Sequence, residues 1–235
     1  MVMGKYRRKQ QQSGQEIIEF GLVLILFVPL LMGAVATGMG MVQSIQTNSV
    51  CRDLDDMYIH GADFSTYSMQ QMAQRLAQGM NLQIGSSFTA NQQTNTSNGG
   101  NGIVLVSQIM WVGGTTSPNC QAVGASNCTN ANSFVFTQRI EFGNSTLKTA
   151  GNDTLGDPTT TAISTQGIIY NPITDSGARL SSSGQTNMQT LWQSGANGTT
   201  ALVDGQVVYV VETYFKNGMT FGSFSPVGTY ARYFF

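Results

Sequence analysis

Charge is scarce in this chain. Only 10% of its 235 residues are Asp, Glu, Lys or Arg, whereas soluble globular domains average about a quarter. The formal net charge is −1 at pH 7, and no concentration of basic residues follows the first ten positions. Nucleic-acid binding depends on concentrated positive charge that displaces counterions from phosphates. The composition therefore argues against nucleic acid as a general partner.

Histidine is almost absent, which removes several kinds of catalytic site. His60 is the only histidine, so a two-histidine zinc motif is impossible, and any Ser-His-Asp triad would depend on this one residue at a predicted helix end. Phosphate-binding glycine loops and EF-hand spacing are missing as well, and the acidic residues at 53–56 are interpreted as a solvated helix face. We therefore predict a protein that is not an enzyme and has no cofactor or bound metal.

The few charges are unevenly placed. Lys5, Arg7, Arg8 and Lys9 precede 23 residues without a formal charge, from Phe20 to Val42. A helix of that length spans a hydrocarbon core of about 30 Å, and the segment is longer than the apolar core of a cleaved signal peptide. Because basic flanks stay on the cytoplasmic side, we predict a retained single-pass anchor in the inner membrane, with residues 43–235 exported.

Glu19 lies at the entrance to this apolar segment. A carboxylate near the bilayer interior costs about 2.5–3.5 kcal/mol on insertion scales, so we expect it to have a partner. If the chain were cut after Gly14, Gln15 would carry a new α-amino group one helical turn from Glu19, within the chain or between neighbouring chains. The alternative is that Glu16 and Glu19 lie among the headgroups and favour the helix N-terminus through its dipole.

These residues carry a resemblance to a known family. The basic leader, Gly14, Glu19, Phe20 and the run "IEFGLVLILFVP" resemble the class III signal of type IV pilins and pseudopilins, and most closely the TadE/TadG-like branch of tight-adherence pili. Pro29 falls later than the usual proline of that branch, and Gln15 is a less typical first mature residue. The endings "GQVVYVVETYF" and "GTYARYFF" also fit the family.

The resemblance implies a set of partners and a function. A prepilin peptidase would cut between Gly14 and Gln15 and remove residues 1–14 as a leader. Glu19 and Phe20 would take part in assembly with other pilin-like subunits, and the chain would be a structural subunit, by its size a minor pseudopilin, displayed on the cell surface when assembled. The alternative function is a monomeric, membrane-tethered surface binding domain of the adhesin type.

The remaining pattern predicts an α+β fold. We expect a transmembrane and assembly helix with its extension over residues 15–60, ended by Gly61, and an exported domain over 61–235 with a second helix starting at Ser68. Strands are predicted at 102–112, 133–142, 206–215 and 228–235, all antiparallel. The segments 91–102 and 143–200 are expected to be a flexible loop and a loop-rich surface insertion, the latter with one helical stretch at 187–193. Apolar stripes are expected at Ile45, Val50, Leu54, Met57 and Tyr58 of the first helix and at Met69, Met72, Ala73, Leu76 and Met80 of the second.

The three cysteines agree with export. Cys120 and Cys128 are separated by seven residues in a loop rich in glycine, serine and asparagine, and in an exported chain a local disulfide between them is the natural interpretation. Cys51 is left over. We expect it to be a buried small residue on the first helix rather than an intermolecular bridge.

Overall fold

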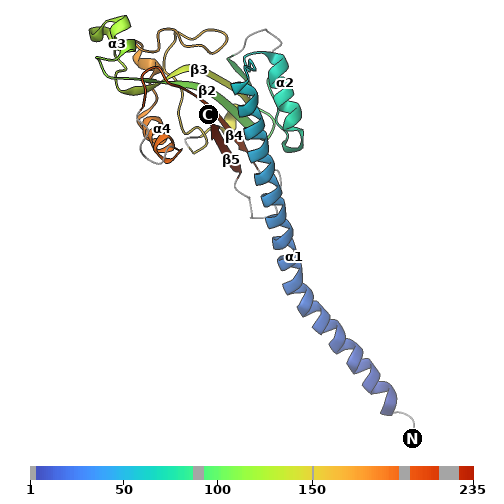
Figure 1. Ribbon diagram of the computed structural model, residues 1–235. Coiled ribbons are helices and arrows are strands. Elements are labelled where there is room, and N and C mark those ends of the chain that lie inside the picture. The colour runs from blue at the N-terminus through green and yellow to red at the C-terminus, as the bar shows by residue number, and fades with distance from the viewer. Residues whose placement is uncertain (1–3, 87–92, 150, 196–201, 217–227) are drawn as a thin grey trace. The chain divides into compact units, whose positions relative to one another are not determined.

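The computed structural model describes residues 4–86, 93–149, 151–195, 202–216 and 228–235 (Figure 1). Within these residues the protein is α+β, as predicted, with a long helix, shorter helices and a five-stranded mixed sheet. The chain divides into two compact units, residues 1–42 and 43–235, which are described separately. The helices are α1 (Gly4–Ile59), α2 (Tyr67–Leu76), α3 (Pro118–Val123) and α4 (Ser182–Gly195), with short 3₁₀ turns at η1 (Gln78–Met80), η2 (Ala125–Asn127), η3 (Ser145–Leu147) and η4 (Ser176–Ala178).

The first unit consists of the N-terminal part of α1. Every side chain from Gln15 to Val42 is exposed or partly exposed, although most of them are apolar. Pro29 lies inside the helix, where it removes one backbone donor. Membrane helices tolerate such a proline because neighbouring groups satisfy the freed carbonyl. The unit therefore has the composition of a lipid-facing or helix-facing segment.

The sheet of the second unit has the strand order β1-β3-β2-β4-β5. Strands β2 (Gly102–Val112), β3 (Ser133–Asn144), β4 (Val207–Phe215) and β5 (Thr229–Phe234) each run antiparallel to their neighbours among these four, as predicted. The fifth strand, β1 (Thr94–Ser97), lies parallel to β3 at one edge.

The β1 strand corrects the expectation of a loop at 91–102. Its polar sequence gives no strand signal, but tertiary contacts hold it in place. Asn95 is buried and donates a hydrogen bond to Gln70 Oε1 at 2.6 Å, while its carbonyl accepts one from the Gly85 amide at 3.2 Å. Strand formation here depends on these neighbours rather than on intrinsic propensity.

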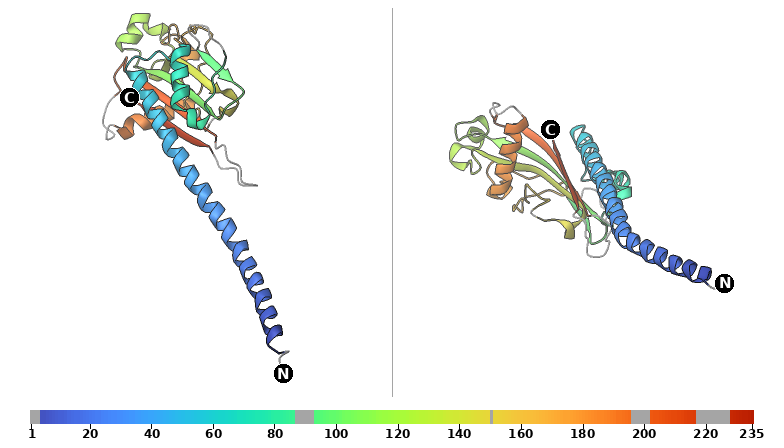
Figure 2. Two further views of the ribbon diagram at one scale, coloured as in Figure 1. Left: turned by 90° about the vertical axis from the view of Figure 1, so that its right-hand side faces the viewer. Right: turned by 90° about the horizontal axis from the view of Figure 1, so that it is seen from below.

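One face of the sheet is covered by residues 43–59 of α1 and by α2 (Figure 2). Val50, Cys51, Leu54 and Tyr58 form the buried stripe of α1, and Cys51 donates to the Val211 carbonyl at 3.3 Å. Cys51 is thus the buried small residue that was expected, and Met57 is partly buried. The expectation was wrong for Ile45, which is exposed. Gly61 follows the helix end with φ of +87°, a conformation that suits glycine.

Helix α2 packs through only part of the expected stripe: Ala73 and Met80 are buried and Met69 is partly buried, as predicted. It begins at Tyr67, so Ser68 lies inside the helix rather than at its cap. Met72 and Leu76 are exposed, whereas Gln70 and Ala73 are buried. The reason is polar: the Gln70 side chain donates to the Phe64 carbonyl and accepts from Asn95, which fixes this face of the helix against the domain.

The described parts of the segment 143–200 pack on the other face of the sheet and form more than a surface insertion. It contains little regular structure before α4, which includes the predicted 187–193 stretch and is longer than expected. Its apolar residues are nevertheless buried against β2, β3 and β4, where they form the second hydrophobic core. The members that this segment contributes are Leu155, Ile169, Ala178, Leu180 and Met188.

Candidate functional site

The first candidate site is the apolar segment of α1. Within the described residues, α1 from Gln15 to Ile59 is the one helix that is long and apolar enough to cross a membrane. None of the side chains in its most apolar stretch is buried. The helix is therefore a candidate membrane anchor. The large apolar side chains that it exposes before residue 43 are Ile17, Ile18, Phe20, Leu22, Val23, Leu24, Ile25, Leu26, Phe27, Val28, Leu30, Leu31, Met32, Val35, Met39, Met41 and Val42.

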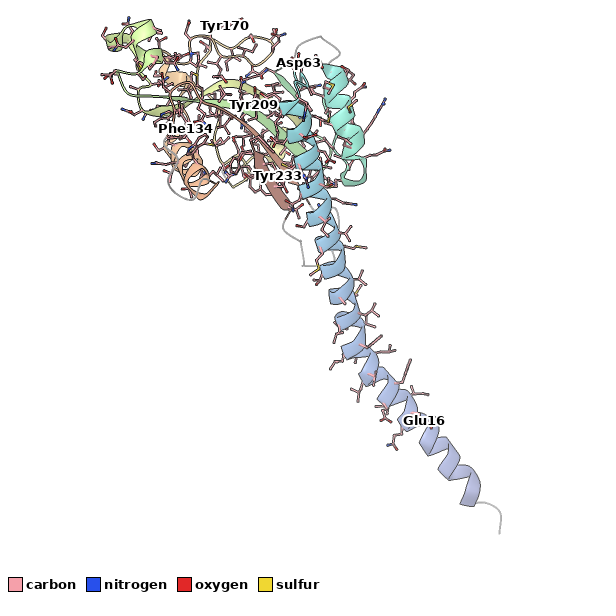
Figure 3. The ribbon with its side chains drawn as sticks, in the orientation of Figure 1. Glu16, Asp63, Phe134, Tyr170, Tyr209 and Tyr233 are labelled. Atoms are coloured by element: carbon pink, nitrogen blue, oxygen red, sulfur yellow. A yellow bond between two sulfur atoms is a disulfide. The ribbon has the colours of Figure 1, made fainter. Side chains whose placement is uncertain are left out.

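The residues predicted for processing and assembly all lie on this helix. Gly14 and Gln15 are in helical backbone, and Glu19 and Phe20 follow one turn later. Glu19 is exposed, and no hydrogen bond or ion pair joins it to another described residue. Glu16 also projects from the N-terminal part of α1 (Figure 3). Within the described part of this chain, Glu19 therefore has no protein partner, and its carboxylate is accessible to a second molecule.

A second candidate site is a buried ionic cluster on the sheet, which the sequence analysis did not identify. Its centre is Arg139 of β3, which is only 2% exposed. Arg139 Nη2 lies 2.6 Å from Asp153 Oδ1, and Nη1 donates to the Ser107 hydroxyl at 2.6 Å. Lys148 Nζ bridges Glu141 Oε2, at 2.6 Å, and Asp157 Oδ2. The cluster thus ties the segment after β3 to the sheet.

The cluster continues across β4 to β5. Glu212 of β4 is buried, and its Oε2 lies 3.8 Å from Arg139 Nη1. Its Oε1 accepts hydrogen bonds from the Thr154 backbone amide at 3.1 Å and from the Tyr230 hydroxyl at 2.7 Å. Arg232 of β5, directly opposite Glu212 in the sheet, donates to the Thr154 hydroxyl at 2.6 Å. Four neighbouring strands, β3, β2, β4 and β5, therefore share one polar network.

The electrostatics favour the charged forms of the two buried cations in this cluster. Burial disfavours the charged guanidinium of Arg139, but the carboxylates of Asp153, Glu212 and Asp157 outweigh it and raise the pKa. The same balance raises the pKa of Lys148, where burial is opposed by hydrogen bonds to Asp157 and Glu141. Neither cation is available as a proton donor near neutral pH. The arrangement is suited to holding the chain together rather than to acid–base chemistry.

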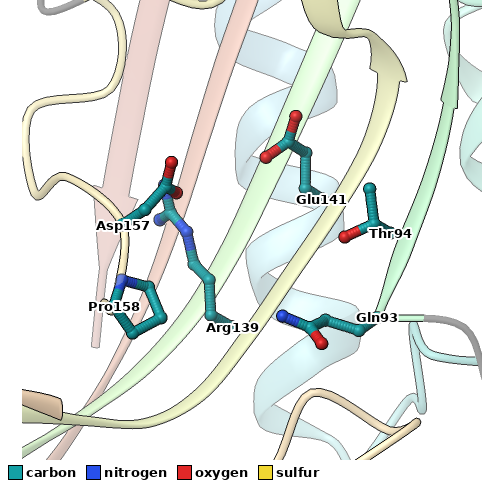
Figure 4. A pocket seen from close by; sticks show the side chains of 6 residues that line it. All are labelled: Gln93, Thr94, Arg139, Glu141, Asp157 and Pro158. Atoms are coloured by element: carbon teal, nitrogen blue, oxygen red, sulfur yellow. The ribbon is translucent and has the colours of Figure 1, made fainter. Parts of the chain in front are cut away.

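A small cavity opens beside this cluster. Its volume is about 220 Å³, and Arg139, Glu141 and Asp157 contribute to its wall (Figure 4). Asp157 is the most accessible of these charges, with 51% of its side chain exposed. Cavities for drug-sized ligands usually measure about 300–1,000 Å³, so only a smaller molecule would fit. The other lining residues are Gln93, Thr94 and Pro158.

The third polar feature is Asp55 on α1, which is 1% exposed. Neither of its carboxylate oxygens has a hydrogen-bond partner among the described groups. Burial, together with the neighbouring charge of Asp56, raises the pKa of Asp55 to about 6. The stretch 53–56 was interpreted from sequence as a solvated helix face, and for Asp55 this is wrong.

The disulfide loop lies at the far end of β2 from the ionic cluster. Cys120 and Cys128 are joined by a disulfide, with their Cα atoms 5.1 Å apart. Asp204 anchors the same region by accepting hydrogen bonds from the Gly113 and Asn119 amides at 2.7 and 2.8 Å. Within the described chain, no three Asp, Glu, His or Cys side chains meet in a way that could hold a metal ion.

Comparison with known proteins adds no relative. No protein-family profile, no curated protein and no solved structure matches the chain.

Proposed function

We propose that the chain is a pilin-like structural subunit, a minor pseudopilin of a tight-adherence type pilus or filament. The observation that carries this proposal is the composition of α1. A single helix holds both an apolar segment with no buried side chain and, after residue 43, the stripe Val50, Cys51, Leu54 and Tyr58 that packs on an antiparallel sheet. One element thus joins a membrane-competent segment to the core of the exported domain.

The charges of α1 give the proposed assembly its direction. The basic residues before position 10 stay in the cytoplasm, and residues 43–235 are exported to the cell surface as the filament forms. Apolar side chains between Gln15 and Val42 face lipid before assembly and other subunits afterwards. Glu19 then pairs with the new amino group at Gln15 of a neighbouring subunit, because an unpaired carboxylate in an apolar environment is costly.

Processing tests the first step. In cells that contain a prepilin peptidase, the mature chain should lack residues 1–14, and mass spectrometry of the N-terminus measures this directly. Gly14→Val should block cleavage, because a branched side chain would replace the small residue before the scissile bond. Gly21→Val is the matched control: a Cβ at Gly21 meets no atom within 4 Å, and the position lies beyond the cleavage point. A chain that starts at Met1 in assembled material would refute cleavage.

Assembly tests the role of Glu19. Glu19→Ala should leave membrane insertion intact, because the anchor becomes more apolar, while the amount of assembled protein on the cell surface falls. Glu16→Ala is the control and should have a milder effect, since Glu16 lies nearer the hydrated headgroups. Both variants are compared at equal membrane levels. If only Glu16→Ala reduces assembly, the wrong glutamate has been chosen.

The second candidate function is a monomeric surface binding domain. The observation in its favour is the cavity lined by Arg139, Glu141 and Asp157, which is the kind of polar recess that holds a small surface ligand. In that case neither Glu19→Ala nor Glu16→Ala would alter the amount of protein on the surface. The two variants therefore separate the two functions.

A further inference from the structure

The outer edge of β5 carries backbone groups without partners among the described residues. Tyr209 and Phe235 exchange both of their backbone hydrogen bonds, at 2.9 and 3.0 Å. Because such pairs alternate along an antiparallel ladder, the amides and carbonyls of Tyr230, Arg232 and Phe234 point away from β4. No hydrogen bond within the described chain uses these groups. The last strand thus presents an open row of donors and acceptors.

This edge lacks most of the features with which proteins usually block strand pairing. Edge strands are commonly protected by proline, charged side chains such as lysine, a bulge or very short length, and Arg232 is the one charged residue here. The β5 strand spans six residues, TYARYF, pairs with β4 without a register shift and contains neither proline nor lysine. Tyr233 lies on it close to α1 (Figure 3), and Phe235 follows it with 74% of its surface exposed. An edge of this kind readily accepts another strand.

The opposite edge of the sheet is built differently. The β1 strand has only four residues, all of them polar. The Gly85 amide already occupies its Asn95 carbonyl at 3.2 Å. The β1 edge of another copy is therefore a poor partner for β5.

We propose that β5 pairs with β5 of a second copy of this chain, antiparallel, so that the sheets of two subunits join edge to edge. An antiparallel edge is complementary to itself, because each residue that points outward offers one donor and one acceptor. The side chain of Arg232 does not block it: Arg232 donates to the Thr154 hydroxyl of its own chain at 2.6 Å, which draws the guanidinium toward its own sheet and away from the shared edge. This inference relies on the proposed function only in that it requires copies to meet.

The register follows from the three outward residues. Full overlap sets Tyr230 opposite Phe234 of the second copy and Arg232 opposite its own equivalent, which forms about six backbone hydrogen bonds. Opposed residues in such pairs have Cα atoms about 5.5 Å apart, within the range for a disulfide. Two Tyr230 residues would instead be offset by four positions, or about 13 Å.

Cysteine cross-linking of the full-length chain in membranes tests this register. Two differently tagged variants, Tyr230→Cys and Phe234→Cys, are produced separately and together, and disulfide formation is induced by mild oxidation. The mixture should give a dimer that contains both tags, several-fold more than either variant gives alone. Tryptophan fluorescence and an intact Cys120–Cys128 bond show that each variant is folded.

A second pair of variants isolates the backbone donor. Phe234→Pro and Phe234→Ala both remove the ring, but only proline also removes the amide that points outward. Because that amide has no partner in the chain's own sheet, both variants should fold equally well. Neither variant carries a cysteine at position 230 or 234, so cross-linking cannot be measured in this pair. The readout is instead the amount of assembled protein, which should fall several-fold more for Phe234→Pro.

The outcomes separate this inference from the function. If the chain is processed and assembles but the mixed cysteine variants give no dimer with both tags, the β5 pairing is wrong and the pilin-like function stands. Equal cross-linking of single and mixed variants would also overturn the pairing, as would capture of a different protein instead of a second copy. If processing and assembly are both absent, the function itself fails.

Discussion

The buried carboxylate of Asp55 makes the stability of this protein depend on pH in an unusual direction. Asp55 is 1% exposed, and its oxygens have no hydrogen-bond partner among the described groups. Burial is the main cause that raises its pKa from 3.8 to about 6, and the charge of Asp56 adds to it. The folded state therefore binds this proton more tightly than the unfolded state. Stability from this group is present below about pH 4 and is lost as the pH rises toward 6.

The magnitude follows from the two pKa values. A difference of about two units, at 1.36 kcal/mol per unit, amounts to about 3 kcal/mol at neutral pH. The effect is only about 1 kcal/mol at pH 4.5, because that pH lies less than one unit above the pKa of the unfolded state, while the folded state is still protonated. Asp55→Asn removes the titrating group with little change of shape. An amide without partners can carry its own penalty of about 1–3 kcal/mol, but that penalty is the same at every pH.

The assay is denaturant unfolding of the full-length chain in detergent, followed by tryptophan fluorescence. Both tryptophans, Trp111 and Trp192, are in the domain formed by residues 43–235, so the signal reports that domain. The free energy of unfolding of Asp55→Asn relative to the parent should rise by about 2 kcal/mol between pH 4.5 and 7.5. Asp53→Asn is the control, because Asp53 is an exposed carboxylate on the same helix and is not among the groups that shift the pKa of Asp55. A parallel pH dependence of parent and Asp55→Asn would refute the reasoning.

Two other predictions concern the cluster and the cysteines. Asp153→Asn should lower the free energy of unfolding by about 3 kcal/mol, because it leaves the buried Arg139 guanidinium short of a partner. Lys148→Met should lower it less, because Lys148 is more accessible to water. Equal losses of the two variants in urea unfolding would contradict this. Alkylation should label Cys120 and Cys128 only after reduction, and Cys51 only after unfolding, because burial raises the pKa of its thiol to about 12. Mass spectrometry locates the label, and rapid labelling of any of the three cysteines in the native, unreduced chain would contradict this prediction.

Much of the fold could be predicted from local pattern. The apolar runs rich in β-branched residues in β2 and β4, and the 23 uncharged residues of α1, each specify one element without reference to the rest of the chain. The spacing of Cys120 and Cys128 gave the disulfide in the same way. These predictions were correct because a few residues close together in the sequence contain all the information that each one needs.

Features that depend on contacts far apart in sequence could not be predicted in this way. Strand β1 is polar and is held by Gln70 and Gly85, so its own residues give no indication of a strand. The exposure of Met72 and Leu76 on α2 has the same origin, since the buried Gln70 helps to fix the inner face of this helix. The segment 143–200 forms a core from apolar residues that are widely spaced among polar ones, and composition alone hides them.

The ionic cluster did leave a signal in the sequence, but an incomplete one. Arg139 and Glu212 each interrupt a strand rich in apolar residues, and a charge that is buried needs a partner. In the sheet, β2 lies between β3 and β4, with Ser107 opposite Arg139 and Leu105 opposite Glu212. Strand order is the missing information: it brings the two charges within 3.8 Å of each other. Two opposite charges in separate apolar strands therefore predict that the strands lie close in the sheet. The other members of the cluster, Asp153 and Lys148, could not be predicted, because they reach the sheet only when the segment after β3 folds back onto it.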